Sequence, residues 1–248
     1  MAEVLITLGI IGIVAAMTLP AIIQKKQEKA TVTALKKFYS VLSQAYLFAE
    51  SENGTPDVWG FSKDDSTLLL TNMTKYMQVL KVCKTGEICH PVKTILWRNG
   101  NKISNTIFNP VDKRRSAAVL NDGMIIGVFV QSPDCSVVYG KNNKHLTSIC
   151  GEFMVDINGA KNPNQYGVDI FIFNVTKYGI IPSGAQVFTN AQDFEPNAGI
   201  NLRNYRFETG CLQATSYGWG CTGWVLQNEN LDYLHCSDLS WTGKSKCK

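Results

Sequence analysis

The chain has 248 residues, which is enough for one sizeable domain with an added helix or for two small domains. Hydrophobic residues make up 45% of it and aromatic residues 10%, a composition that excludes a disordered chain. The net charge of +4 is too small to indicate a general nucleic-acid-binding protein.

The first 23 residues form an apolar run in which Glu3 carries the only charged side chain. A run of about 20 apolar residues can cross a bilayer as a helix, so residues 1–23 are predicted to form a transmembrane helix. A carboxylate in such a helix is costly unless it has a partner, which makes Glu3 a candidate functional residue. Gly12 and Pro20 both weaken helices, so the stretch between them is the weakest part of the predicted rod.

This run, AEVLITLGIIGIVAAMTLPAII, has Glu3, Gly12 and Pro20 at a spacing that resembles the N-terminus of type IV pilins and type II secretion pseudopilins. The likeness covers residues 1–50, and the rest of the chain matches only in general plan. It implies a subunit that is held in the inner membrane and then polymerises into a filament whose core is a bundle of these helices. The implied partners are further copies of itself, the prepilin peptidase and the pilus assembly machinery.

The resemblance also implies roles for particular residues. Glu3 would pair with the N-terminal amine of the adjacent subunit during assembly, and the alternative is an idle protonated acid at the membrane edge. The segment from Gly12 to Pro20 would lose its helical form in the filament or remain a kinked helix. Only Met1 and Ala2 precede Glu3, whereas the family has four residues there, so two mature residues and a basic leader are expected before Met1.

Residues 24–52 change from an apolar to an amphipathic pattern. Apolar residues recur at steps of three and four, at Leu35, Phe38, Tyr39, Leu42, Ala45, Tyr46 and Ala49. This spacing places them on one face of a helix and predicts a second half-helix that docks on a globular head. Asn53 and Gly54 are expected to end this helix.

Residues 53–248 are predicted to form the head, with an antiparallel sheet of about four strands over residues 93–182 packed on the helix. Residues 68–82 are predicted to hold a short helix. After Arg115, the segment SAAVL, an Asn-Asp-Gly turn and the segment MIIGVFV predict a hairpin, because this turn favours positive φ. GEFMVDI, VDIFIFNV and GIIP supply the other predicted strands. The fold class is therefore α+β.

Eight cysteines occur, and none lies in the first 82 residues: Cys83, Cys89, Cys135, Cys150, Cys211, Cys221, Cys236 and Cys247. The even number suits disulfides in an oxidising compartment such as the periplasm or the cell exterior. We predict Cys83–Cys89 and Cys135–Cys150 as sequential pairs and leave the pairing of the last four open. The alternative, zinc ligation, is disfavoured because no C-x-x-C pair occurs. In residues 183–248, disulfides are expected to replace a core, with little regular structure.

Residues 156–169 gather oxygen-bearing side chains around two glycines: Asp156, Asn158, Asn162, Asn164 and Asp169. Calcium takes six to eight oxygen ligands from loops of this kind, so the segment is a candidate calcium site. It is not an EF-hand, because the closing Glu is missing. The alternative is a turn in which the Asn and Asp side chains bond to their own backbone.

The chain carries no G-x-S-x-G, phosphate-loop or H-E-x-x-H motif and is predicted not to be an enzyme. Lys113, Arg114 and Arg115 form a basic cluster that would contact DNA phosphates or lie solvated at a turn. The leading prediction is a structural subunit of a type IV pilus-like filament, first in the inner membrane and then extracellular, whose head could meet a surface ligand. The alternatives are a minor pilin, a periplasmic pseudopilin, and a membrane-anchored periplasmic carbohydrate-binding protein or enzyme.

Overall fold

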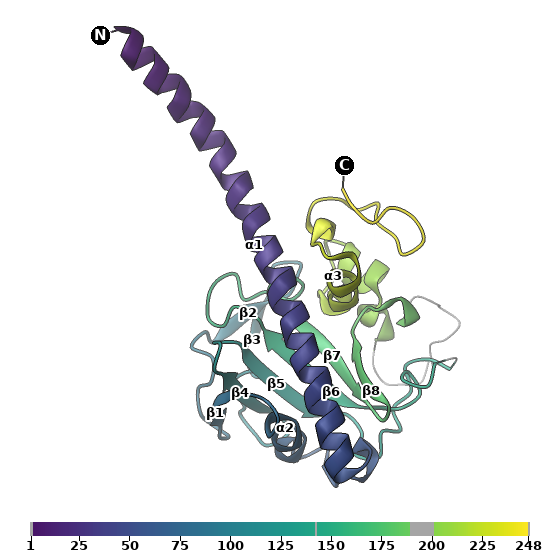
Figure 1. The fold of residues 1–248 in the computed structure, drawn as a ribbon. Coiled ribbons are helices and arrows are strands. Elements are labelled where there is room, and N and C mark those ends of the chain that lie inside the picture. Colours follow the sequence, from purple (N-terminus) through teal and green to yellow (C-terminus); the bar gives the residue numbers. More distant parts are fainter. Residues whose placement is uncertain (1, 142, 189–200, 248) are drawn as a thin grey trace.

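The computed structural model describes residues 2–141, 143–188 and 201–247, with the backbone alone for residues 2–6 and 9. A single helix, α1 (Ala2–Asn53), dominates its shape. Figure 1 shows the C-terminal half of α1 lying across the sheet and its N-terminal half extending far beyond the head. The 52 residues correspond to about 78 Å at 1.5 Å per residue. Pro20 lies inside this helix without ending it.

The head is built on a six-stranded antiparallel sheet with the order β1-β4-β5-β6-β7-β8. Its strands are β1 (Val79–Cys83), β4 (Ser116–Leu120), β5 (Ile125–Val130), β6 (Ile149–Asp156), β7 (Ile170–Thr176) and β8 (Gly179–Pro182). A separate two-stranded sheet contains β2 (Thr94–Leu96) and β3 (Lys102–Ser104). The hairpin β4-β5 and the sheet-forming segments after Arg115 confirm the strand predictions.

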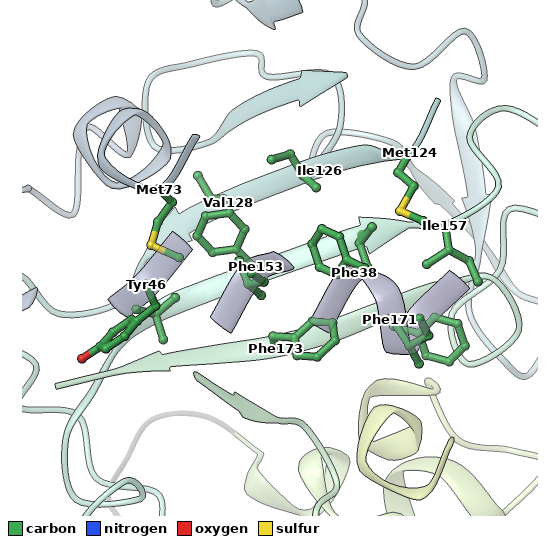
Figure 2. Close-up of a cluster of buried hydrophobic side chains, with 14 of the residues drawn as sticks. Phe38, Tyr46, Met73, Met124, Ile126, Val128, Phe153, Ile157, Phe171 and Phe173 are labelled. Carbon is green, nitrogen blue, oxygen red and sulfur yellow. The ribbon is translucent and has the colours of Figure 1, made fainter. Parts of the chain in front are cut away.

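Strands β6 and β7 are buried along their whole length because both faces of the sheet are covered. One face packs against the buried stripe of α1, and Figure 2 shows Phe38 and Tyr46 of that helix among residues of β5, β6 and β7. The rings of Phe38 and Phe173 lie 5.5 Å apart, and Tyr39 stacks on Phe173 at 5.6 Å. This apolar layer joins the helix to the sheet and forms the main core.

Short helices surround the sheet. They are η1 (Pro56–Val58), α2 (Thr67–Thr74), η2 (Gln186–Phe188), η4 (Leu202–Tyr205), the π-helix η5 (Glu208–Leu212), η6 (Trp219–Cys221), α3 (Thr222–Asn228) and η7 (Asp232–Leu234). Helix α2 contributes Leu69, Leu70 and Met73 to the main core. The opposite face of the sheet is covered by the β2-β3 hairpin and by C-terminal segments.

Two predictions about the head, those for the sheet and for the C-terminal region, are wrong in detail. The sheet has six strands rather than about four, and it begins at β1 rather than near residue 93. The short helix predicted within residues 68–82 is confirmed as α2, and most of β1 follows it in the same segment. The C-terminal region does have a packed core, since Phe207 and Trp224 are fully buried and stack with ring centroids 4.0 Å apart.

Candidate functional site

The projecting half of α1 exposes a long series of apolar side chains. Nine large apolar side chains among the described residues 7–23 are 50–76% exposed: Leu8, Ile10, Ile11, Ile13, Val14, Met17, Leu19, Ile22 and Ile23. Contiguous exposed apolar surface of this extent marks a site that another molecule covers. We call this segment, residues 7–23, the apolar rod.

The helix enters the head near Val32, where its apolar residues become buried: Val32, Leu35, Phe38, Leu42, Ala45, Tyr46 and Ala49. The Tyr46 hydroxyl donates to the carbonyl of Lys177 at 2.8 Å. Two ion pairs at the rim, Lys36–Glu229 at 2.6 Å and Lys37–Asp122 at 2.8 Å, join α1 to the C-terminal region and to the β4-β5 turn. Exposed pairs of this kind add little stability, so the buried stripe fixes the direction of the rod.

The three residues predicted to act in assembly all lie on the N-terminal part of α1. Glu3 is in the helix, but its side chain lies outside the described residues. Gly12 and Pro20 lie within the apolar rod, and the helix is continuous through both. The predicted loss of helix between them concerns the filament and stays a prediction.

No helix in the described part of the chain is long and apolar enough to cross a membrane. The predicted span at residues 1–23 also uses residues 1–6 and 9, whose side chains lie outside that part.

The candidate calcium residues are brought together between β6 and β7, at the end of the sheet from which the rod leaves. Asp169 accepts hydrogen bonds at both oxygens, from the backbone N–H of Gln165 at 2.6 Å and of Asn164 at 2.9 Å, and from Asn158 Nδ2 at 3.1 Å. Asp156 Oδ1 accepts from the Asn158 N–H at 3.2 Å. Its Oδ2 lies 3.1 Å from His90 Nε2.

His90 acts here as a donor. The backbone N–H of Val92 donates to His90 Nδ1 at 3.1 Å, so the neutral imidazole carries its proton on Nε2 and donates it to Asp156. With its side-chain nitrogen turned inward, Asn164 donates to Asp156 Oδ2 and to the carbonyl of Gly159, both at 3.1 Å. Sequence reasoning missed His90, because nothing local links it to a carboxylate 66 residues away.

These contacts favour the turn over the calcium site. The N–H donors that surround the two carboxylates occupy the positions from which a cation would be coordinated. Within the described residues, no group of three or more His, Cys, Asp or Glu side chains is arranged to hold a metal ion. The calcium site stays a prediction, and these hydrogen bonds support the alternative, a turn held by its own side chains.

Addition of a calcium chelator is expected to leave the thermal unfolding midpoint of the protein unchanged, because the loop needs no ion to satisfy Asp156 and Asp169. Thermal unfolding followed by circular dichroism, with and without the chelator and then with excess calcium, measures this. A midpoint that falls with the chelator and returns with calcium would restore the calcium site.

The free energy of unfolding should depend on the ionisation of Asp169. Burial, followed by the charge of Asp156, raises the pKa of Asp169 to about 7. Because the folded chain then holds this proton more tightly than the unfolded chain, stability should fall as pH rises from about 4 to about 7. In Asp169→Asn this fall should be smaller by about 2–4 kcal/mol.

Urea denaturation at pH 4.5, 6 and 8 tests this expectation. The comparison uses the slope of the free energy of unfolding against pH. Absolute stabilities are not compared, because Asn at this position also changes the hydrogen bonds of the loop. Asp112→Asn, which alters an exposed carboxylate, is the matched control and should follow the wild-type slope. Identical slopes for Asp169→Asn and wild type would contradict the assignment.

The disulfide predictions are confirmed. All eight cysteines are paired, as Cys83–Cys89, Cys135–Cys150, Cys211–Cys221 and Cys236–Cys247, which leaves none for zinc. The pairs span 6 to 15 residues, so each bond closes a local loop of the head.

The basic cluster after residue 112 is engaged by the chain itself. Arg114 pairs with Asp112 at 2.6 Å, and Lys113 lies 3.8 Å from Asp65. Arg115 Nη1 donates to Thr106 Oγ1 at 2.5 Å. These contacts support the solvated turn rather than a patch that contacts DNA.

The fold and the exposed surface define an α+β head carried on a projecting apolar helix. The chain belongs to a protein family whose model matches residues 21–222 and which is described as a family of unknown function (DUF6613). The match includes the docked half of α1 and the whole six-stranded sheet. A comparison with curated proteins finds no match, and neither does a comparison with solved structures.

Proposed function

We propose that this protein is a structural subunit of a filament and that it assembles through the apolar rod. The main support for the proposal is a set of nine apolar side chains that are each at least half exposed. They lie on a helix that projects from the head (Figure 1). Fully burying one such side chain contributes about 1.5–3 kcal/mol, so covering the rod strongly favours association.

Apolar rods of other subunits are suited to cover the exposed side chains of the rod. Gly12, Ala15 and Ala16 are small residues that let neighbouring helices approach closely. The rod and the head lie at opposite ends of the molecule, so a contact between successive copies need not close on itself and can continue as a fibre. The heads would then lie on the outside of the bundle.

The resemblance of residues 1–50 to pilins and pseudopilins supplies the rest of the proposal. The subunit would be held in the inner membrane, processed by a prepilin peptidase and inserted into an extracellular or periplasmic filament by an assembly machinery. Glu3 would pair with the N-terminal amine of the neighbouring subunit, since a carboxylate inside an apolar bundle requires neutralisation or a partner. A minor subunit or a pseudopilin would use the same contact.

Electron microscopy of sheared surface fractions, with antibody against the head and mass spectrometry of the N-terminus, tests the proposal. Filaments that bind the antibody are expected from wild-type cells, and none from cells carrying Glu3→Gln. Glu229→Gln makes the same chemical change on the head and should leave the filaments intact. A full-length protein that stays monomeric in water without detergent, or normal filaments from Glu3→Gln, would refute it. Monomers that remain in the membrane would instead indicate an anchored binding protein or enzyme.

A further inference from the structure

A cavity of about 130 Å³ lies on the face of the sheet that is turned away from α1. Along β6, Phe153 points toward α1, so its neighbours Glu152 and Met154 point to this opposite face. The β2-β3 hairpin and the short helices η4 and η6 cover the same region. We call this space the aromatic cavity, and its principal lining residues are Trp97, Arg115, Glu152, Tyr166, Tyr205 and Trp219.

Aromatic rings form one wall of the aromatic cavity. The centroid of Trp97 lies 4.9 Å from that of Tyr166 and 5.7 Å from that of Trp219. The Tyr205 ring lies 5.3 Å from Trp219 and extends the wall toward β6. A continuous aromatic surface of this kind holds apolar groups and small rings by contact.

Glu152 supplies a negative group at the inner end of the cavity, where it is only 1% exposed. All of its hydrogen bonds end on Oε1, from Gln131 Nε2 at 2.6 Å and from the hydroxyls of Tyr205 at 2.5 Å and Tyr139 at 3.3 Å. Among the described residues, neither a hydrogen bond nor an ion pair engages Oε2. Burial raises the pKa of Glu152 to about 7, because its effect outweighs the hydrogen bonds to Oε1 and the charge of Arg115, which favour the ionised form. A ligand cation could therefore bind at Oε2, while Oε1 keeps its hydrogen bonds to the protein.

Arg115 supplies a positive group at the other side. It also lines a neighbouring surface cavity with Asp112 and Arg114, so it lies at the boundary between the aromatic cavity and the exterior. Its Nη1 is held by Thr106, and the remaining guanidinium N–H groups suit a carboxylate.

We propose that the aromatic cavity binds a small zwitterionic α-amino acid, with the ammonium on Glu152, the carboxylate on Arg115 and the apolar part against Trp97. The two charged groups of opposite sign select a ligand that carries both charges. An apolar cavity of about 150 Å³ holds one benzene, so the space here suits about six to eight non-hydrogen atoms, the size of alanine, serine or proline. The site does not depend on the proposed assembly.

Other small ligands fit the two charged groups less well. An amine without a carboxylate leaves Arg115 unmatched, and an acid without an amine places its charge near Glu152. A neutral sugar would stack on the aromatic wall without using either charge. The three ligand types can therefore be separated with matched probes.

Isothermal titration calorimetry on the full-length chain in mild detergent at pH 8 tests the proposal. The probes are alanine, serine and proline, together with pyrrolidine, which lacks the carboxylate of proline, cyclopentanecarboxylate, which lacks its nitrogen, and glucose. At least one amino acid is expected to bind. Pyrrolidine and cyclopentanecarboxylate should bind about tenfold or more weakly than the best amino acid, because each loses a charge-assisted contact.

Two variants test whether the amino acid binds in the aromatic cavity. Glu152→Gln and Arg115→Gln should each weaken amino-acid binding about tenfold or more, whereas Glu87→Gln, an exposed carboxylate on the loop after β1, should bind as wild type. Arg115→Gln alone decides the question if Glu152→Gln does not fold, as judged by circular dichroism. Absence of binding by all three amino acids, equal binding of glucose or of either proline analogue, or unchanged affinity in Arg115→Gln would overturn the proposal.

Discussion

A chain in which Ile13 and Met17 are both changed to asparagine is expected to form no filaments while its head stays folded. The two side chains are 59% and 76% exposed on the apolar rod. Figure 1 shows this part of α1 projecting away from the head. Transfer of an amide into an apolar environment without a hydrogen-bond partner costs about 1–3 kcal/mol in proteins, and each subunit would place two such groups in the bundle. Electron microscopy measures the filaments, and circular dichroism with sedimentation measures the fold and the mass.

The matched control replaces two exposed polar residues of the same helix, Ser40→Asn and Ser51→Asn. It introduces the same side chains at positions where they stay in water, so the number of filaments should equal that of wild type. Wild-type filaments from the Ile13 and Met17 variant would show that the rod is not the assembly surface. Equal loss in the control would show that the effect is not specific to the apolar residues.

Trp224→Ala is expected to reduce the free energy of unfolding of the head by about 3–5 kcal/mol, the range for truncation of a large buried aromatic residue. Trp224 is fully buried, stacks on Phe207, and its ring lies 5.1 Å from that of Trp241. Its Nε1 donates to Asn230 Oδ1 at 3.0 Å, so truncation also removes a hydrogen bond. The loss of stability should therefore come from weaker packing of α3 against the main core.

Urea denaturation measures this change. It is monitored by far-ultraviolet circular dichroism, because the substitution itself alters tryptophan fluorescence. Tyr178→Ala removes an aromatic ring that is 46% exposed and lies outside the core, and it should alter stability by about 0.5 kcal/mol or less. A loss below about 1 kcal/mol for Trp224→Ala would mean that disulfides, rather than packing, hold the C-terminal region, as the sequence alone had indicated.

The parts of the fold that could be predicted are those with a strong local pattern. The three- and four-residue spacing of Leu35, Phe38 and Leu42 predicted the helix, and the Asn-Asp-Gly turn predicted the β4-β5 hairpin. The pairs Cys83–Cys89 and Cys135–Cys150 followed from their closeness in sequence. In each case the interacting residues lie within a short stretch of chain, so the sequence contains the whole signal.

The parts that could not be predicted depend on distant residues. Strand β1 has three exposed central residues and no clear alternation, and it forms because β4 pairs with it more than 30 residues later in the chain. His90 reaches Asp156 only because the segment before β2 folds over the far face of the sheet. The aromatic cavity likewise joins Trp97 to Trp219 across most of the head.

The uninterrupted course of α1 has a mechanical consequence. Tension applied along the rod passes directly into the docked half of the same helix and loads its buried stripe in shear, so that many side-chain contacts resist together. All four disulfides lie beyond residue 82, and none tethers α1 to the head. A sufficiently large pull would therefore separate the helix from the sheet without breaking a disulfide, and the backbone after Asn53 would still connect the helix to the head.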